Sequence, residues 1–141
     1  MPAPVMTVDE LQRFLLAAFP GNPPTTVVED VAATGVRLRL PVTAANERPG
    51  GTVSGPSLMA LADSAAWLSV LAQIGPVALA VTTSLHIDFL RKPALVDVLA
   101  QGRILKLGSR LAVPDVALWS DGGSPDQPVA QAQVTYSIPP R

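Results

Sequence analysis

The sequence predicts an α+β fold, in which one antiparallel sheet of about six strands packs against a long apolar helix. The first observation is length, because 141 residues suit one domain and are short for two. The second is the stretch 57–74, which is apolar on almost every side and therefore indicates a central helix. The third is a series of alternating segments after that stretch, joined by turns, which favours antiparallel pairing.

The N-terminal region, 1–25, is expected to form a helix followed by a linker. Thr7 and Glu10 form a capping-box pattern, and apolar residues then recur at helical spacing over 8–18. The dipeptide Pro20-Gly21 ends this helix, and a Pro-rich connection leads from it to the core.

The core, 26–138, is expected to form a single domain with the N-terminal region, over 1–141. Ser54 suits the N-cap of the central helix and Gly75 its end. Pro114 predicts a bulge or an edge in its strand. The expected strands are 27–33, 36–40, 77–90, 97–107, 108–120 and 129–138, with loops over 41–51 and 121–128 and a tail over 139–141.

Composition excludes several classes of protein. With 48% hydrophobic and 15% charged residues, the chain is too apolar to be disordered. A net charge of -1 gives no basic excess for nucleic acid or an anionic membrane. The absence of cysteine excludes disulfides and thiolate sites, and fits the cytoplasm. Low charge on so small a protein indicates a covered surface, so we expect a homo-oligomer.

No export or membrane segment is expected. The N-terminus lacks a basic region and carries Asp9 and Glu10, unlike a secretory signal. The stretch 57–74 is long enough for a membrane span but contains Asp63 and Gln73, which favours a buried helix.

Common catalytic motifs are absent. His86 is the only histidine, and no nucleophile elbow, phosphate loop or dinucleotide motif occurs. One histidine and scattered acids make a poor metal site, so we expect neither a metal nor an organic cofactor.

Asp63 is the first candidate for chemistry, as the only charged residue between Arg48 and Asp88. A carboxylate on an apolar helix is costly unless it is paired, protonated or reached from a cleft, which suits a general base or acid. A structural Asp bonded to a buried backbone group or a distant Arg is an equal alternative. Its neighbours at helical spacing are all apolar: Pro56, Met59, Ala60, Ala66, Trp67 and Val70.

The start of the same helix is the second candidate. Free N–H groups at a helix N-terminus attract an anion or a developing oxyanion, and Gly55 permits close approach of a ligand. Asp63 lies about 12 Å further along the helix axis. An ordinary loop and N-cap is the simpler interpretation of this segment taken alone.

Three segments resemble the hot-dog-fold acyl-CoA thioesterases of the phenylacetate-pathway (PaaI-like) type: Ser54-Gly55-Pro56, 58–65 and 83–93. The resemblance covers about 26–138 and implies a sheet wrapped around the central helix. It also implies a homodimer or a dimer of dimers that hydrolyses an acyl-CoA thioester at a site between subunits. Asp63 would act there as general base or nucleophile, and the Gly55 N–H would polarise the carbonyl.

The chain departs from that family at the helix start. Ser54 replaces the family's His, and Pro56 replaces the second Gly, which removes one N–H. Trp67 stands where some relatives have Thr or Ser, and with Met59 it is expected to line the acyl pocket. Asn46 is expected to order a water or the loop before the motif, with a plain turn Asn as an equal alternative.

Basic and polar residues supply the remaining candidates. Arg91, Lys92 and Arg110 are candidates for binding the phosphates of coenzyme A. His86 and Asp88 share one face of a strand, and in related proteins this strand pairs with its copy, so a role at the interface is expected.

Three alternatives stay open. A catalytically inactive hot-dog protein that binds acyl-CoA or another apolar ligand would explain the replacements at Ser54 and Pro56. A hydratase on the same fold ranks low, because His86 is not placed beside Asp63. A structural assembly module is the third.

Overall fold

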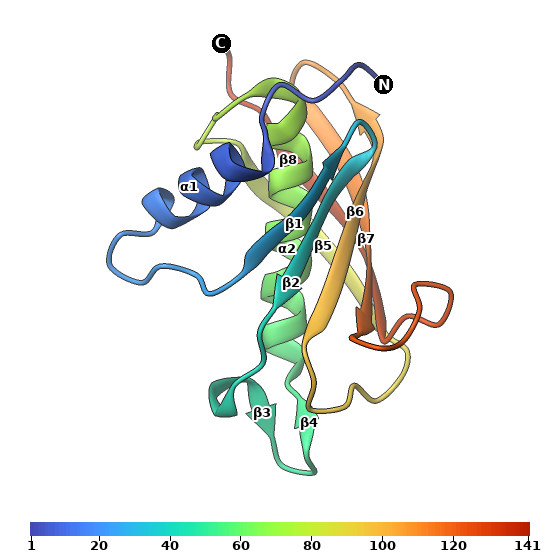
Figure 1. The fold of residues 1–141 in the computed structure, drawn as a ribbon. Coiled ribbons are helices and arrows are strands. Elements are labelled where there is room, and N and C mark those ends of the chain that lie inside the picture. The colour runs from blue at the N-terminus through green and yellow to red at the C-terminus, as the bar shows by residue number, and fades with distance from the viewer.

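The computed structural model describes residues 1–141 and confirms the α+β hot-dog architecture. Six antiparallel strands, in the order β1-β2-β6-β7-β8-β5, curve around the long helix α2, Gly55–Ile74 (Figure 1). Both termini lie at the same end of the molecule, opposite the end where α2 begins. The strands are β1 Val27–Ala32, β2 Gly35–Leu40, β5 Val81–Phe89, β6 Val98–Leu107, β7 Leu111–Ser120 and β8 Ala130–Ser137.

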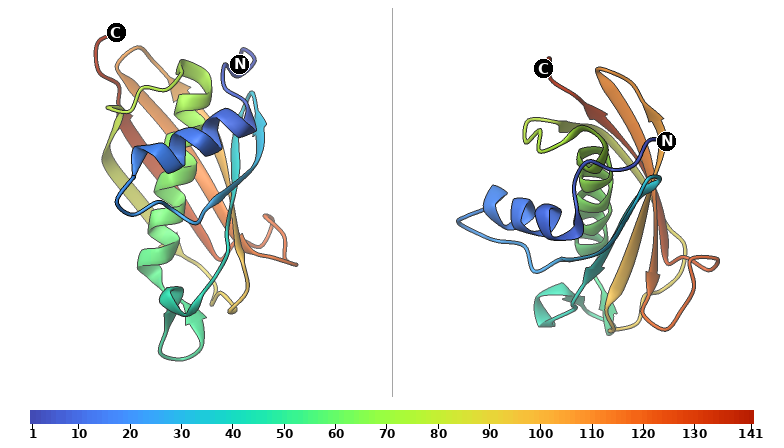
Figure 2. Two further views of the ribbon diagram at one scale, coloured as in Figure 1. Left: turned by 60° about the vertical axis from the view of Figure 1, so that its left-hand side comes forward. Right: turned by 45° about the horizontal axis from the view of Figure 1, so that its top comes forward.

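Helix α1 spans Val8–Ala18 and begins with the predicted capping box of Thr7. Figure 2 shows it outside α2, on the side away from most of the sheet. Its Gln12 amide joins it to the sheet by donating to the Thr26 carbonyl and accepting from the Val28 N–H. Leu11 and Leu15 on its inner face are buried in the core.

Helix α2 starts and ends as the sequence predicts. Ser54 is its N-cap, accepting a hydrogen bond from the Ser57 N–H, and Gly75 is its C-cap with φ 95°. By length and composition alone α2 could cross a membrane. Its place in the concave face of the sheet, with half of its residues buried, explains its apolar character as that of a core helix.

Close packing fixes α2 against the sheet near its middle. The buried Ser69 hydroxyl donates to the Ala65 carbonyl at 2.7 Å and accepts from the Val36 N–H at 3.0 Å. Gly102 on β6 lies beside it, and a Cβ there would sit 2.1 Å from Ser69 Oγ. Glycine is therefore needed for helix and strand to approach so closely.

The predicted edge at Pro114 is wrong, because β7 lies inside the sheet between β6 and β8. The predicted bulge is confirmed, but it lies in the facing strand: the register shifts between Ile104 and Lys106, opposite Pro114. A bulge accommodates the missing proline N–H inside the sheet.

Two further differences concern segment boundaries. The strand expected from 77 begins at Val81. The loop expected over 41–51 contains regular structure, η1 Ala44–Asn46 and β3 Glu47–Arg48. Strand β3 pairs with β4 Thr52–Val53, which follows the loop and leads into α2.

Strand β5 forms an open edge of the sheet. It pairs only with β8, although β6 and β7 lie between the two strands in the chain order. Leu85 and Ile87 are half-buried toward the core, while the other residues of β5 are exposed. The backbone along its free side is available for pairing.

Candidate functional site

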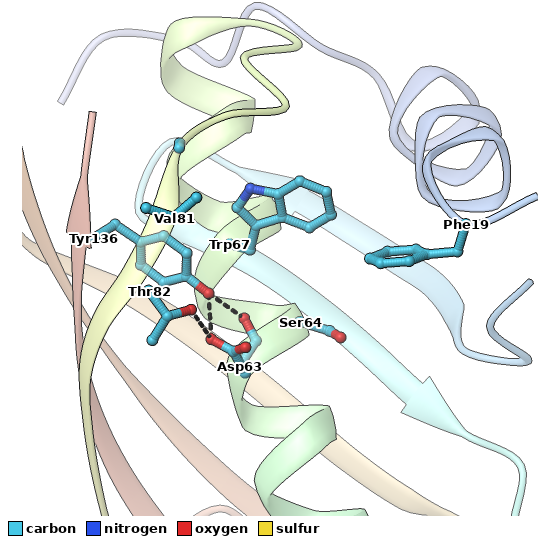
Figure 3. Close-up of a pocket in the computed structure, with 8 residues that line it drawn as sticks. Phe19, Asp63, Ser64, Trp67, Val81, Thr82 and Tyr136 are labelled. Carbon is cyan, nitrogen blue, oxygen red and sulfur yellow. Dashed lines mark hydrogen bonds between the residues drawn. The ribbon is translucent and has the colours of Figure 1, made fainter. Parts of the chain in front are cut away.

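Two hydroxyl groups from the sheet hold the Asp63 carboxylate (Figure 3). Tyr136 on β8 donates its phenol to Asp63 Oδ1 and also lies 2.8 Å from the Asp63 carbonyl oxygen. Thr82 on β5 donates to the same Oδ1 at 2.7 Å. No group of the chain donates to Oδ2, so one carboxylate oxygen is anchored and the other is free.

Asp63 lines a cavity of about 400 Å³ with mostly apolar walls. Trp67 lines it as well, so the structure brings these two predicted site residues together. The Trp67 ring lies 5.5 Å from that of Phe14 and 6.1 Å from that of Phe19, between centroids. The N-terminal helix and the residue that follows it therefore support one wall. The remaining lining residues are Ser64, Ala80, Val81, Thr82 and Tyr136.

The Tyr136 phenol remains a proton donor over the ordinary pH range. Burial raises its pKa well above the usual 10, and the Asp63 charge and hydrogen bond raise it further. A phenolate beside the Asp63 carboxylate would place two negative charges together in a buried site. Tyr136 therefore stabilises Asp63 as a neutral donor.

Gly55 lines a second cavity, of about 520 Å³, at the start of α2. Its N–H donates to no group of the chain. The Phe89 ring lies 3.5 Å from where a Gly55 Cβ would be. Arg91 and Lys92 line the same cavity, together with Arg48. A free helix N–H surrounded by cations favours an anionic or carbonyl ligand.

Asn46 orders the loop before α2, one of the two roles expected for it. Its amide donates to Ser57 Oγ at 3.1 Å and accepts from the Thr43 N–H at 2.9 Å. Ser54 donates its N–H to the Asn46 carbonyl at 2.7 Å. Asn46 and Pro56 line a third cavity, apart from Gly55 and Asp63.

Two predicted binding residues lie outside both of the main cavities. Met59 is 41% exposed on α2 and lines neither of them. Arg110, in the turn between β6 and β7, donates to the Ile138 carbonyl at 3.1 Å. That turn lies at the opposite end of the molecule from the start of α2 (Figure 1), apart from Arg91 and Lys92.

His86 and Asp88 share the outer face of β5, as the alternation predicts. His86 Nε2 lies 3.1 Å from Asp88 Oδ2, and both side chains are largely exposed. His86 therefore lies on the opposite face of the sheet from Asp63.

The sequence prediction missed Thr82, Tyr136 and Phe19. The sequence does contain an indication of Tyr136, which is the only tyrosine. It alternates with Val134 and Ile138 along one strand, so all three are expected to face the core. A tyrosine in a core needs a partner for its hydroxyl, and Asp63 was the only carboxylate of the apolar helix.

Within one chain, Gly55 and Asp63 line different cavities. The carboxylate has an apolar cavity beside it, and the free N–H has a cationic one. Neither cavity alone contains both a group that could activate water and a group that could polarise a carbonyl.

The sequence model of the thioesterase superfamily matches residues 50–126 of the chain. A candidate thioesterase from Silicibacter sp. TM1040 is 46% identical, with a TM-score of 0.88 over 97% of this chain and 94% of that one. Zebrafish thioesterase superfamily member 2 is 19% identical, with a TM-score of 0.81 over 95% of this chain and 99% of the other. A thioesterase from Haemophilus influenzae is 15% identical, with a TM-score of 0.77 over 96% and 92%. The last two show the fold alone, and no curated protein matches the chain.

Proposed function

The chain belongs to the thioesterase superfamily, and from this premise we propose that it hydrolyses acyl-CoA thioesters with Asp63 and Gly55. Hydrolysis of a thioester in general is what the family membership supports. The carboxylate geometry carries the rest of the proposal: Asp63 has one anchored oxygen and one free oxygen beside an apolar cavity.

A dimer through β5 would bring the two cavities together. Near its start, β5 carries Thr82, which is hydrogen-bonded to Asp63, and its last residue is Phe89, which lines the same cavity as Gly55. If two copies pair antiparallel along this open edge about a two-fold axis, the start of one strand faces the end of the other. Asp63 of one subunit then approaches Gly55 of the partner subunit.

The proposed reaction uses these two groups together. The Gly55 N–H polarises the thioester carbonyl at the positive end of the helix. Asp63 Oδ2 removes a proton from water, whose oxygen attacks the carbonyl carbon. The C–S bond breaks, and the thiolate takes the proton, giving an acid and a thiol.

Direct attack by Asp63 on the carbonyl is the other possible course. Single-turnover hydrolysis in heavy-oxygen water distinguishes the two. Base catalysis places the label in the acid during the first turnover. Attack by Asp63, followed by hydrolysis of the anhydride at the Asp63 carboxyl, gives an unlabelled acid.

The two cavities suit the two parts of an acyl-CoA. Arg48, Arg91 and Lys92 would bind the phosphates, since cations suit phosphate oxygens. The acyl group would lie beside Trp67 in the apolar cavity. This reaction requires no metal or organic cofactor, and a cytoplasmic location remains the expectation from the sequence.

The test measures turnover on short, medium, long and aryl acyl-CoAs. We expect Asp63→Ala to lower kcat about 100-fold or more, because loss of a general base costs about 10²–10⁴-fold. Ser64→Ala is the matched control, since Ser64 lines the same cavity without bonding to Asp63. Wild-type protein that turns over no member of the panel would contradict the proposal.

Binding without catalysis is the second candidate function, favoured by Pro56. Its ring removes an N–H from the first turn of α2, where a carbonyl would be polarised. Calorimetry with the same thioesters would then show binding by folded wild-type protein that has no turnover.

A further inference from the structure

We propose that Tyr136 is a positioning residue for Asp63, and that it determines which carboxylate oxygen takes the proton. The inference rests on the proposed function at Asp63. It adds a group from the far end of the chain that neither the sequence motifs nor the match over 50–126 includes.

The phenol of Tyr136 fixes Asp63 at two points. It contacts the side-chain Oδ1 and lies 2.8 Å from the backbone carbonyl of the same residue. A buried hydroxyl that contacts both the side-chain Oδ1 and the backbone carbonyl of one residue restricts the rotation of that side chain. Tyr136 is itself only 2% exposed, so the ring has little freedom to move.

The hydrogen bonds make the two carboxylate oxygens unequal. Oδ1 accepts from Tyr136 and from Thr82, while Oδ2 accepts from no group of the chain. An oxygen whose lone pairs already accept two donors is a poor acceptor for a further proton. Oδ2 is therefore the oxygen that faces water and substrate.

Tyr136 acts through Asp63 and not as an acid or base of its own. Burial and the Asp63 charge keep the phenol protonated, and its single proton is directed at Asp63. With the ring held in the core, replacement by phenylalanine keeps most of the packing and removes only the hydroxyl.

The experiment measures kcat and KM for Tyr136→Phe, Thr82→Val and Thr83→Val. We expect Tyr136→Phe to lower kcat about 10- to 100-fold with KM within about two-fold of wild type, because a misplaced catalytic group costs about that much. Thr82→Val should lower kcat less, because the Tyr136 contact remains. Thr83→Val is the matched control, since its hydroxyl donates to the Thr135 carbonyl and not to Asp63.

Two kinetic outcomes would overturn the inference. One is a Tyr136→Phe protein with wild-type kcat, and the other is a raised KM with unchanged kcat, which would indicate packing alone. If the wild type turns over no substrate, the proposed function fails and the inference fails with it. If the wild type is active and Tyr136→Phe has the same kcat, only the inference about Tyr136 is overturned, and the proposed function stands.

A second measurement detects the contact between Tyr136 and Asp63 without requiring turnover and without altering Tyr136. Tyr136 is the only tyrosine, so phenolate absorbance in alkaline solution reports on it alone. In folded Asp63→Asn, the phenol should ionise at lower pH than in wild type, because a neighbouring negative charge is gone. Equal ionisation in the two proteins would show that Tyr136 and Asp63 do not interact, which overturns the inference even where Tyr136→Phe fails to fold.

Discussion

At the scale of the residue, Tyr136 makes stability depend on pH in alkaline solution. Its phenol pKa is raised in the folded protein, whereas in the unfolded chain it stays near the ordinary 10. The unfolded chain therefore loses this proton first as the pH rises. The stabilising contribution is complete below about pH 10 and falls above it, by at most about 1.4 kcal/mol per pH unit.

The prediction is a difference between wild type and Tyr136→Phe. Urea unfolding from about pH 8 to about pH 11 should show a constant difference in the free energy of unfolding up to about pH 10, and then a decline. Subtracting the free energy of unfolding of the variant from that of wild type removes the contribution of lysines, which titrate in the same pH range. A difference that stays constant to about pH 11 would contradict the raised pKa.

The sequence predicted Asp63 but not the residues that hold it. An acid within an apolar helix stands out in a one-dimensional pattern, because the helix supplies its own neighbours at fixed spacing. Thr82 and Tyr136 approach it through pairing of β5 with β8, and sequence spacing does not determine which strands pair across a sheet. Of the two residues expected to line the acyl pocket, Met59 and Trp67, both lie one turn from Asp63 on the same helix, but only Trp67 lines the cavity beside Asp63.

At the scale of the element, the fold depends on how closely α2 approaches the sheet. Gly102 lies against Ser69, and a Cβ built at Gly35 would sit 2.0 Å from the Gly102 carbonyl oxygen. Helix boundaries were predictable because Ser54 and Gly75 are local signals. The close approach of α2 to β6 was not predictable, because a glycine in a strand such as Gly102 has no distinctive local sequence pattern. Pro114 shows the same limit: its missing N–H was evident, but not the strand that would bulge opposite it.

We expect Gly102→Ala to destabilise the protein by about 3 kcal/mol or more. The new methyl group would lie 2.1 Å from Ser69 Oγ and 3.0 Å from the Ala65 carbonyl oxygen, so Ser69 would have to give up its buried hydrogen bonds. Gly21→Ala is the matched control, because no atom lies within 4 Å of its added Cβ, and it should change stability by less than about 0.5 kcal/mol. Urea unfolding measures both, and equal stabilities would show that α2 and β6 are not packed this closely.

At the scale of the whole molecule, the Asp63 carboxylate and the Gly55 N–H lie in separate cavities along α2. The chain carries few charges, and β5 exposes Val81 and Phe89 on an unpaired edge. These features indicate a surface that is covered by another copy. Asp63, Gly55 and their spacing on α2 were predictable from the sequence, but whether they serve one site depends on an assembly that a single chain does not contain.

A mixed dimer tests that assembly directly. One subunit carries Asp63→Ala and the other Gly55→Pro, and each homodimer should be inactive. Proline suits the first residue of a helix, and the Gly55 N–H bonds to no group of the chain, so this change removes the proposed donor at little cost to folding. Co-expression with two different affinity tags isolates the mixed dimer.

In the mixed dimer, one of the two sites combines an intact Asp63 with an intact Gly55 of the partner subunit. We therefore expect about half of the wild-type turnover per dimer, although neither homodimer is active. If both groups instead serve a site within one chain, every site in the mixed dimer lacks one of them and turnover stays absent. Recovery of activity would thus establish that each catalytic site is shared between subunits, and its absence would require Gly55 and Asp63 to act in the same chain.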